Sequence, residues 1–229
     1  SEPDLGYLVR YGAMHYRMIE GEGEASPYKD IFQVPSASIV QLKPDGSRES
    51  RKYWTLEDSA DLNGAPEELA EQYRDLLEQA VGRRLARFPQ RAFTLSGGLD
   101  SSSVLSMAVQ IEDARQPAFS GVYEDPLYDE SAEIQDMLES CVDSWRAVDL
   151  PNQIAIVDEI DTLIALHDEP VATATWLSHL HICRDVHAQG HDSLFGGLGG
   201  DELNAGEYEY FPYFFADLAG AGQSALLDQ

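Results

Sequence analysis

Lysine is rare in this sequence of 229 residues, which contains only Lys29, Lys43 and Lys52. With arginine there are 15 basic residues against 41 acidic ones, so the net charge is −26 at neutral pH. Proteins that bind nucleic acids neutralise the phosphates with lysine and arginine. The charge balance therefore argues against a nucleic acid as partner.

Long apolar runs are missing as well. No stretch of about 18 apolar residues is present to cross a membrane, and no charged and apolar leader opens the sequence. The two cysteines, Cys141 and Cys183, are too far apart along the chain to suggest a disulfide framework. We expect both thiols to be reduced and buried, in a cytoplasmic protein without a membrane partner.

Acidic residues are in excess and occur along the whole chain. One interpretation is a halophilic protein, because screening at high salt shortens the range of self-repulsion. The other is an ordinary acidic bacterial enzyme, and composition leaves both open. Hydrophobic residues make up 43% of the chain, which is enough for a packed core.

The first part of the chain reads as an irregular segment that ends in a hairpin. Residues 38–42 have strand character, residues 44–46 form a turn signal, and residues 47–54 return as the second strand. A polar segment follows. We therefore expect a small β appendage over residues 1–57 and the main domain over residues 58–229.

From Pro66 onward, helix and strand patterns alternate. The predicted helices cover residues 66–85, 102–111, 130–141, 153–166 and 175–188, and the predicted strands cover residues 92–95, 118–123, 145–148 and 193–195. This alternation predicts an α/β fold with a doubly wound parallel sheet, whose ligand lies beyond the carboxyl ends of the strands.

Two glycine-rich turns follow strands of this sheet. The first, residues 96–101, has the sequence Ser-Gly-Gly-Leu-Asp-Ser, and the second, residues 196–202, has the sequence Gly-Gly-Leu-Gly-Gly-Asp-Glu. Backbone N–H groups in such a turn, at the start of a helix, bind phosphate. Neither turn has the Gly-Lys-Ser/Thr ending of a Walker loop. Asp100 and Asp201 would supply the two carboxylates that suit Mg²⁺ beside a triphosphate.

The first turn resembles the PP-loop of ATP pyrophosphatases. Residues 95–102 and 197–203 resemble the two loops of the synthetase domain in the glutamine-hydrolysing asparagine synthetase family. Further segments resemble that family in the same order along the chain: residues 28–35, 53–54, 128–132 and 168–170.

The resemblance implies an ATP-dependent ligase that adenylates a carboxylate, releases pyrophosphate and passes the acyl group to ammonia or an amine. It implies an ATP site made of Leu95, Ser96, Gly97, Gly98, Asp100, Ser101, Gly121, Gly196 and Gly197. It also agrees with Mg²⁺ on Asp100 and Asp201. No residue is assigned as catalytic.

The sequence departs from the family in three places. Leu198 stands where members that make asparagine usually carry Glu and relatives that close β-lactams carry Tyr. The family has a catalytic lysine downstream of the second loop, whereas no lysine follows Lys52 here. The glutaminase domain of the family uses an N-terminal cysteine as its nucleophile, whereas this sequence begins with Ser1. We therefore expect part of a longer protein, or one that relies on a glutaminase domain or partner chain for ammonia. A homo-oligomer stays open.

Other functions remain alternatives. Leu198 and the missing lysine also fit an ATP-binding module without catalysis, or a homologue that makes a different amide in a secondary metabolite, peptide or glycan. An RNA sulfurtransferase of the PP-loop class is disfavoured by the acidic charge and by the lack of a Cys-x-x-Cys pair.

Two weaker patterns are also present in the sequence. His179, Cys183 and His187 share one face of a predicted helix, but three zinc ligands on one helix rarely complete a tetrahedron, so we favour packing. Aromatic residues crowd positions 208–215, where we expect core or interface packing.

Overall fold

The computed structural model describes residues 2–14, 23–55, 64–125, 127, 130, 132–150, 156–171, 173, 175–204 and 206–220. The chain divides into two units. One consists of Ser1–Gly64 with Ala155–Trp176, and the other of Ala65–Ile154 with Leu177–Gln229. The domain boundary expected after residue 57 lies outside the described residues.

The first unit contains helix α1 (Leu5–Ala13), the hairpin of β1 (Ser38–Leu42) and β2 (Arg48–Lys52), and helix α5 (Ile156–His167). The hairpin is antiparallel, as predicted, with Ser38 opposite Lys52. Helix α1 was not predicted, although its N-cap is a standard one: the Asp4 carboxylate accepts the Tyr7 N–H at 2.9 Å.

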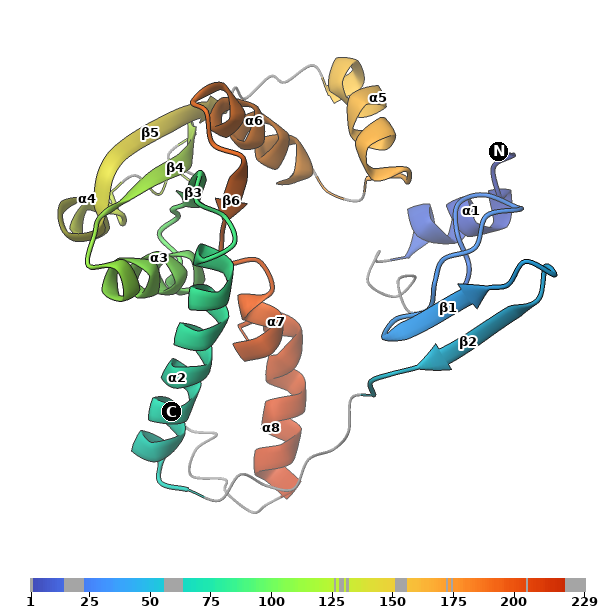
Figure 1. Ribbon diagram of the computed structural model, residues 1–229, viewed down its shortest axis with the longest axis horizontal. Coiled ribbons are helices and arrows are strands. Elements are labelled where there is room, and N and C mark those ends of the chain that lie inside the picture. The colour runs from blue at the N-terminus through green and yellow to red at the C-terminus, as the bar shows by residue number, and fades with distance from the viewer. Residues whose placement is uncertain are drawn as a thin grey trace. The chain divides into compact units, whose positions relative to one another are not determined.

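The second unit is built on a sheet of four parallel strands (Figure 1). The strands are β3 (Arg91–Thr94), β4 (Gln116–Tyr123), β5 (Val142–Leu150) and β6 (Ser193–Phe195), in the spatial order β5-β4-β3-β6. All three pairings are parallel. The predicted α/β fold with a parallel sheet is confirmed.

Helices cover both faces of this sheet (Figure 1). Helices α2 (Pro66–Leu85), α3 (Leu99–Glu112) and α4 (Gln135–Cys141) pack on one face, and α6 (Thr175–Ala188) packs on the other. Neighbouring strand residues alternate between the two cores: Phe93 and Ala118 lie in the first, Ala92 and Phe119 in the second. The central strand β3 and the first part of β4 are therefore buried on both sides, which explains their apolar residues. The edge strand β5 is exposed over residues 143–147.

Three short helical elements follow β6 in the described part of the chain: α7 (Gly200–Asn204), a 3₁₀ helix (Tyr208–Tyr210) and α8 (Phe211–Gly220). The aromatic residues around α8 do not belong to the core of the unit, contrary to one of our expectations. Tyr208 is 85% exposed and Tyr213 is 72% exposed. A role in an interface stays a prediction.

The prediction for the cysteines is half wrong. Cys141 is buried, but Cys183 is exposed. The reason lies in the phase of α6, which turns Ile182 and Val186 toward the sheet and Cys183 outward. Within the described ranges, no three His, Cys, Asp or Glu side chains are grouped so that they could hold a metal ion.

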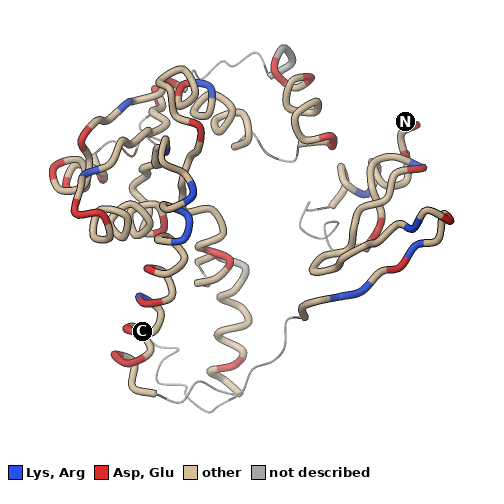
Figure 2. The backbone as a smooth tube through the Cα atoms, viewed as in Figure 1, with Lys and Arg blue, Asp and Glu red and all other residues tan. Residues whose placement is uncertain are grey.

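The distribution of acidic residues and the lack of a long apolar helix among the described residues agree with the sequence analysis. Acidic residues lie along both units (Figure 2). None of the helices in the described part of the chain is long and apolar enough to cross a membrane.

Candidate functional site

The order of the strands places both glycine turns at one position in the sheet. From β3 the chain passes through α3 and α4 to β4 and β5, and it then returns through α6 to β6 on the other side of β3. The connections thus change face between β3 and β6. In open α/β sheets, ligands bind beyond the carboxyl ends of the strands at this switch point. The first turn follows β3 and the second follows β6.

Serine hydroxyl groups hold the first turn in shape. The Ser101 Oγ accepts the Ser96 N–H at 3.1 Å and lies 2.8 Å from the Ser96 Oγ. The Gly98 N–H donates to the Ser96 Oγ at 3.2 Å. Ser101 is buried, whereas Gly97 and Gly98 are exposed. The two serines therefore fix the turn, and both glycine residues lie at the surface.

The Gly97 N–H has an acidic partner. It donates to the Glu130 Oε2 at 2.8 Å, across 33 positions of sequence. A Cβ at Gly97 would lie 2.8 Å from the Glu133 Cβ, closer than real Cβ atoms approach. Position 97 must be glycine because the segment that precedes α4 packs directly on it.

The second turn packs against the start of α3. A Cβ at Gly197 would lie 2.6 Å from both the Asp100 Cβ and the Ser101 N, and a Cβ at Gly200 would overlap the Asp100 carboxylate. Gly199 adopts a φ of +89°, a conformation that favours glycine. Glycine is thus required at three positions of this turn: close packing on α3 requires it at positions 197 and 200, and the backbone conformation favours it at position 199. The two turns therefore meet at Asp100.

Asp100, Asp201 and Glu202 form an acidic group. Asp100 lies in the first turn of α3, while Asp201 and Glu202 lie in the first turn of α7. Burial raises the pKa of Asp100, and the negative charges of Asp201 and Glu202 raise it further. A cation bound at this position would relieve the repulsion. Mg²⁺ can bind through one or two carboxylates with water and phosphate oxygens as its other ligands, although the described residues offer no group of three side chains that could hold a metal ion by themselves.

A buried serine that the sequence analysis missed supports the end of β3. The Ser120 Oγ donates to the Leu95 carbonyl at 2.6 Å and accepts the Trp145 Nε1–H at 3.0 Å. Ser120 is 5% exposed. It therefore ties β3, β4 and β5 together directly below the first turn. The available signal was a polar residue in the middle of an apolar strand.

Of the remaining predicted residues, Leu95 directly precedes the first turn and Gly196 begins the second, whereas Gly121 lies within β4 and packs on Leu150. The Leu95 side chain is buried in the core, so only its backbone faces the turn. A Cβ at Gly196 would lie 2.6 Å from the Thr94 Oγ1, and a Cβ at Gly121 would lie 2.6 Å from the Leu150 Cδ1. Both glycines allow close packing between strands, which is a structural role whether or not they also contact a nucleotide.

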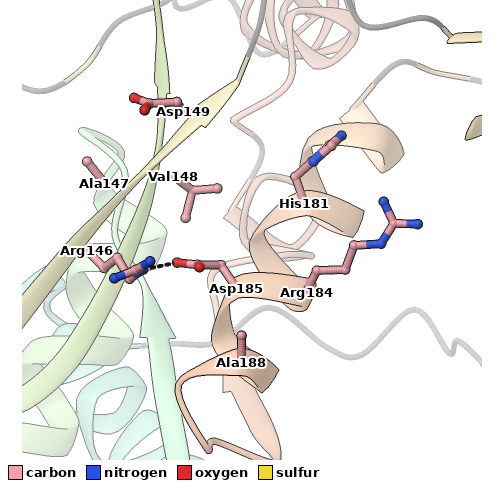
Figure 3. A pocket seen from close by; sticks show the side chains of 8 residues that line it. All are labelled: Arg146, Ala147, Val148, Asp149, His181, Arg184, Asp185 and Ala188. Carbon is pink, nitrogen blue, oxygen red and sulfur yellow. Dashed lines mark hydrogen bonds and ion pairs between the residues drawn. The ribbon is translucent and has the colours of Figure 1, made fainter.

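A shallow, open pocket of about 380 Å³ lies elsewhere in this unit, between β5 and α6 (Figure 3). Arg146 on β5 forms an ion pair with Asp185 on α6 at this pocket (Figure 3). None of the residues that line it belongs to either glycine turn. The predicted site is therefore separate from this pocket.

These features define a class: an α/β protein with two glycine turns and an acidic group at the switch point of a parallel sheet. The family model described as asparagine synthase matches residues 72–221, so the chain belongs to the asparagine synthase family. This is an ATP-using, amide-forming family of ligase type. The recognition made from the sequence is confirmed.

Two curated relatives are distant. The Amidase chyE of Penicillium rubens is 25% identical over 207 residues, which cover 83% of this chain and 30% of the relative. The Amidase chry2 of Gibberella zeae is 25% identical over 201 residues, which cover 80% of this chain and 30% of the relative. This chain thus spans about a third of the length of each.

Proposed function

We propose that this chain binds Mg-ATP at the two glycine turns and activates a carboxylate as an acyl-adenylate, with release of pyrophosphate. An amine or ammonia then displaces AMP and forms the amide. One observation supports this most directly: Asp100 contacts the Gly197–Gly200 turn and is electrostatically coupled to Asp201. The first turn and the second turn thereby act as one site.

Backbone groups are the main anion donors in this proposal. Neither turn contains a lysine or arginine. The backbone N–H groups of Gly97 and Gly98, together with the positive end of α3, bind the pyrophosphate part of ATP. In the structure the first N–H donates to the Glu130 carboxylate and the second to the Ser96 hydroxyl, so a phosphate oxygen competes with these acceptors. Ser96 and Ser101 keep the turn in shape through their hydroxyl bonds.

Asp100 and Asp201 hold Mg²⁺, with Glu202 close by. Bound there, the cation neutralises the phosphates and offsets charge on the leaving pyrophosphate. Since the turns offer no cationic side chain, nucleotide affinity depends strongly on the metal.

The acceptor of the acyl group differs from the one used to make asparagine. Leu198 in the second turn is 75% exposed and has no group to accept a proton or orient an amine. Both curated relatives are named amidases, which agrees with amide chemistry on a different substrate. We infer an acceptor amine other than ammonia, or an acceptor site completed by another part of a longer protein.

Asp201→Asn tests the metal role. In Mg²⁺, the variant should bind ATP at least about tenfold more weakly than the wild type, equivalent to about 1.4 kcal/mol. In EDTA, the two proteins should bind ATP with similar weak affinity. Asp217→Asn, an equal change of charge at an exposed position on α8, is the matched control and should keep wild-type affinity. Equal affinities of wild type and Asp201→Asn in Mg²⁺ would refute the metal role.

ATP–pyrophosphate exchange with a panel of carboxylates tests the activation step. Exchange that depends on one carboxylate class supports adenylation and identifies the substrate class. The exposed Leu198 favours a second candidate, an ATP-binding module without catalysis. Binding of Mg-ATP without exchange, in a protein as long as the relatives, would favour that module and reject the ligase.

A further inference from the structure

The hydrogen bond between Gly97 and Glu130 stands out because of what it joins. The donor is a backbone N–H in a turn that we assign to pyrophosphate, and the acceptor is a carboxylate, at 2.8 Å. A carboxylate oxygen and a phosphate oxygen are equivalent acceptors for such an N–H. The same donor cannot serve both at full strength.

We propose that Glu130 is an internal competitor for pyrophosphate and thereby sets the affinity of the first turn for the nucleotide. The inference rests on the proposed function and deepens it. ATP must displace the Glu130 carboxylate from the Gly97 N–H before its phosphate oxygen takes that position.

The acidic side chains around the Gly97–Glu130 hydrogen bond make the displacement of Glu130 selective for nucleotide that carries a cation. Glu133 lies beside Glu130: its N–H donates to the Glu130 carbonyl at 3.1 Å, and its Cβ packs against Gly97. An anion that approaches Gly97 therefore meets the negative charges of Glu130 and Glu133, and the turn contains no lysine or arginine that would offset these charges. Nucleotide that carries its own cation is repelled less than free nucleotide, so Glu130 favours Mg-ATP over ATP alone.

Glu130→Gln tests the competition. The variant keeps the size of the side chain but replaces a charged acceptor with a neutral one. It should bind inorganic pyrophosphate about fivefold more tightly than the wild type, the difference expected between charged and neutral acceptors. Glu130→Ala removes the acceptor and should bind pyrophosphate at least as tightly as Glu130→Gln.

Glu133→Gln is the matched control. It removes the same charge from the same segment, and among the described residues the Gly97 N–H donates to the Glu130 carboxylate and not to that of Glu133. At about 1 M KCl, where the Debye length is about 3 Å, the effect of Glu133→Gln should disappear while that of Glu130→Gln remains. Equal effects of the two variants at high salt would overturn the proposal, since competition would then be charge repulsion alone.

A readout without ligand checks the bond itself. With ¹⁵N-labelled glycine, the Gly97 amide proton should move upfield in Glu130→Ala, because a strong acceptor is lost. An unchanged Gly97 resonance overturns the proposal. If none of the proteins bound pyrophosphate or Mg-ATP, the proposed function would be overturned. If wild type and Glu130→Gln bound pyrophosphate equally well, the competition would be overturned and the proposed function would stand.

Discussion

Asp100 fills the space in which Gly200 would carry a side chain. A Cβ at position 200 would overlap the Asp100 carboxylate, and a Cβ at Gly197 would lie 2.6 Å from the Asp100 Cβ. The two residues come from different turns, 100 positions apart in the numbering. Close contact at this point requires the absence of side chains on one partner, so the glycines of the second turn are a condition for the site to assemble.

Gly200→Ala should therefore both destabilise the protein and weaken nucleotide binding. Overpacking of this kind lowers the free energy of unfolding by about 1–3 kcal/mol. Because Asp100 must move, Mg-ATP affinity should fall as well. Urea denaturation and calorimetric titration measure the two effects.

Gly82→Ala is the control for this substitution. Gly82 lies inside α2, and its nearest neighbour to an added Cβ is the Ile111 Cδ1 at 3.8 Å, an ordinary contact. Alanine at a helix interior should leave stability unchanged or raise it by up to about 1 kcal/mol. If Gly200→Ala matched Gly82→Ala in stability and in Mg-ATP affinity, the contact with Asp100 would have no energetic consequence.

Ser120→Ala should cost about 1–3 kcal/mol of stability, because the Leu95 carbonyl and the Trp145 Nε1–H both lose the buried Ser120 hydroxyl as a partner. Urea denaturation measures the change. The exposed Ser144, whose hydroxyl bonds only to the adjacent Asp143 among the recorded hydrogen bonds, provides the control, and Ser144→Ala should stay within about 0.5 kcal/mol of wild type. Equal stabilities of the two variants would contradict the supporting role of Ser120.

The strands, the main helices and both glycine turns could be predicted from the sequence because each depends on local signals. Pro66 begins α2 at the expected position, and Ser193–Phe195 forms β6 as expected. Helix α3 begins at Leu99 rather than at residue 102, which places Asp100 inside its first turn. Helix starts are difficult to predict when glycine serves as the N-cap, since Gly98 makes no side-chain bond.

The contacts that define the site could not be predicted in this way. Glu130 was expected at the start of a helix, but α4 begins at Gln135, which leaves Glu130 to bond Gly97. That bond joins residues distant in sequence and depends on the tertiary packing of α3 and α4. The outward orientation of Cys183 likewise depends on which face of α6 meets the sheet.

The net charge of −26 predicts that stability increases with salt. The Debye length falls from about 10 Å at 0.1 M to about 3 Å at 1 M, so repulsion between surface carboxylates weakens. The melting temperature should rise from low to molar KCl. A melting temperature that is flat or falling would count against a halophilic protein.

A variant separates charge repulsion from other effects of salt. Glu71, Asp75 and Glu78 are exposed on α2. Replacing them by Gln, Asn and Gln removes three negative charges from one helix face. The variant should melt at a higher temperature than wild type in low salt and should gain less from KCl. An identical salt response of the two proteins would show that repulsion on this face is not the cause.

The pH dependence of stability should carry a contribution from His179. Burial in α6 lowers the pKa of this histidine below its ordinary value of 6.5. The unfolded chain therefore takes up the proton first as the pH falls, and the free energy of unfolding decreases from about pH 6.5 downward, toward the pKa of the folded state. Above about pH 6.5 this contribution is complete and constant.

The variant His179→Gln tests this contribution. It should lose less stability than wild type between pH 7.5 and pH 5.5. Because the side chain is only half-buried, the difference should be a fraction of the maximum of about 1.4 kcal/mol per pH unit. Urea denaturation at the two pH values measures the difference, and equal losses in the two proteins would show that burial does not hold His179 in its neutral form.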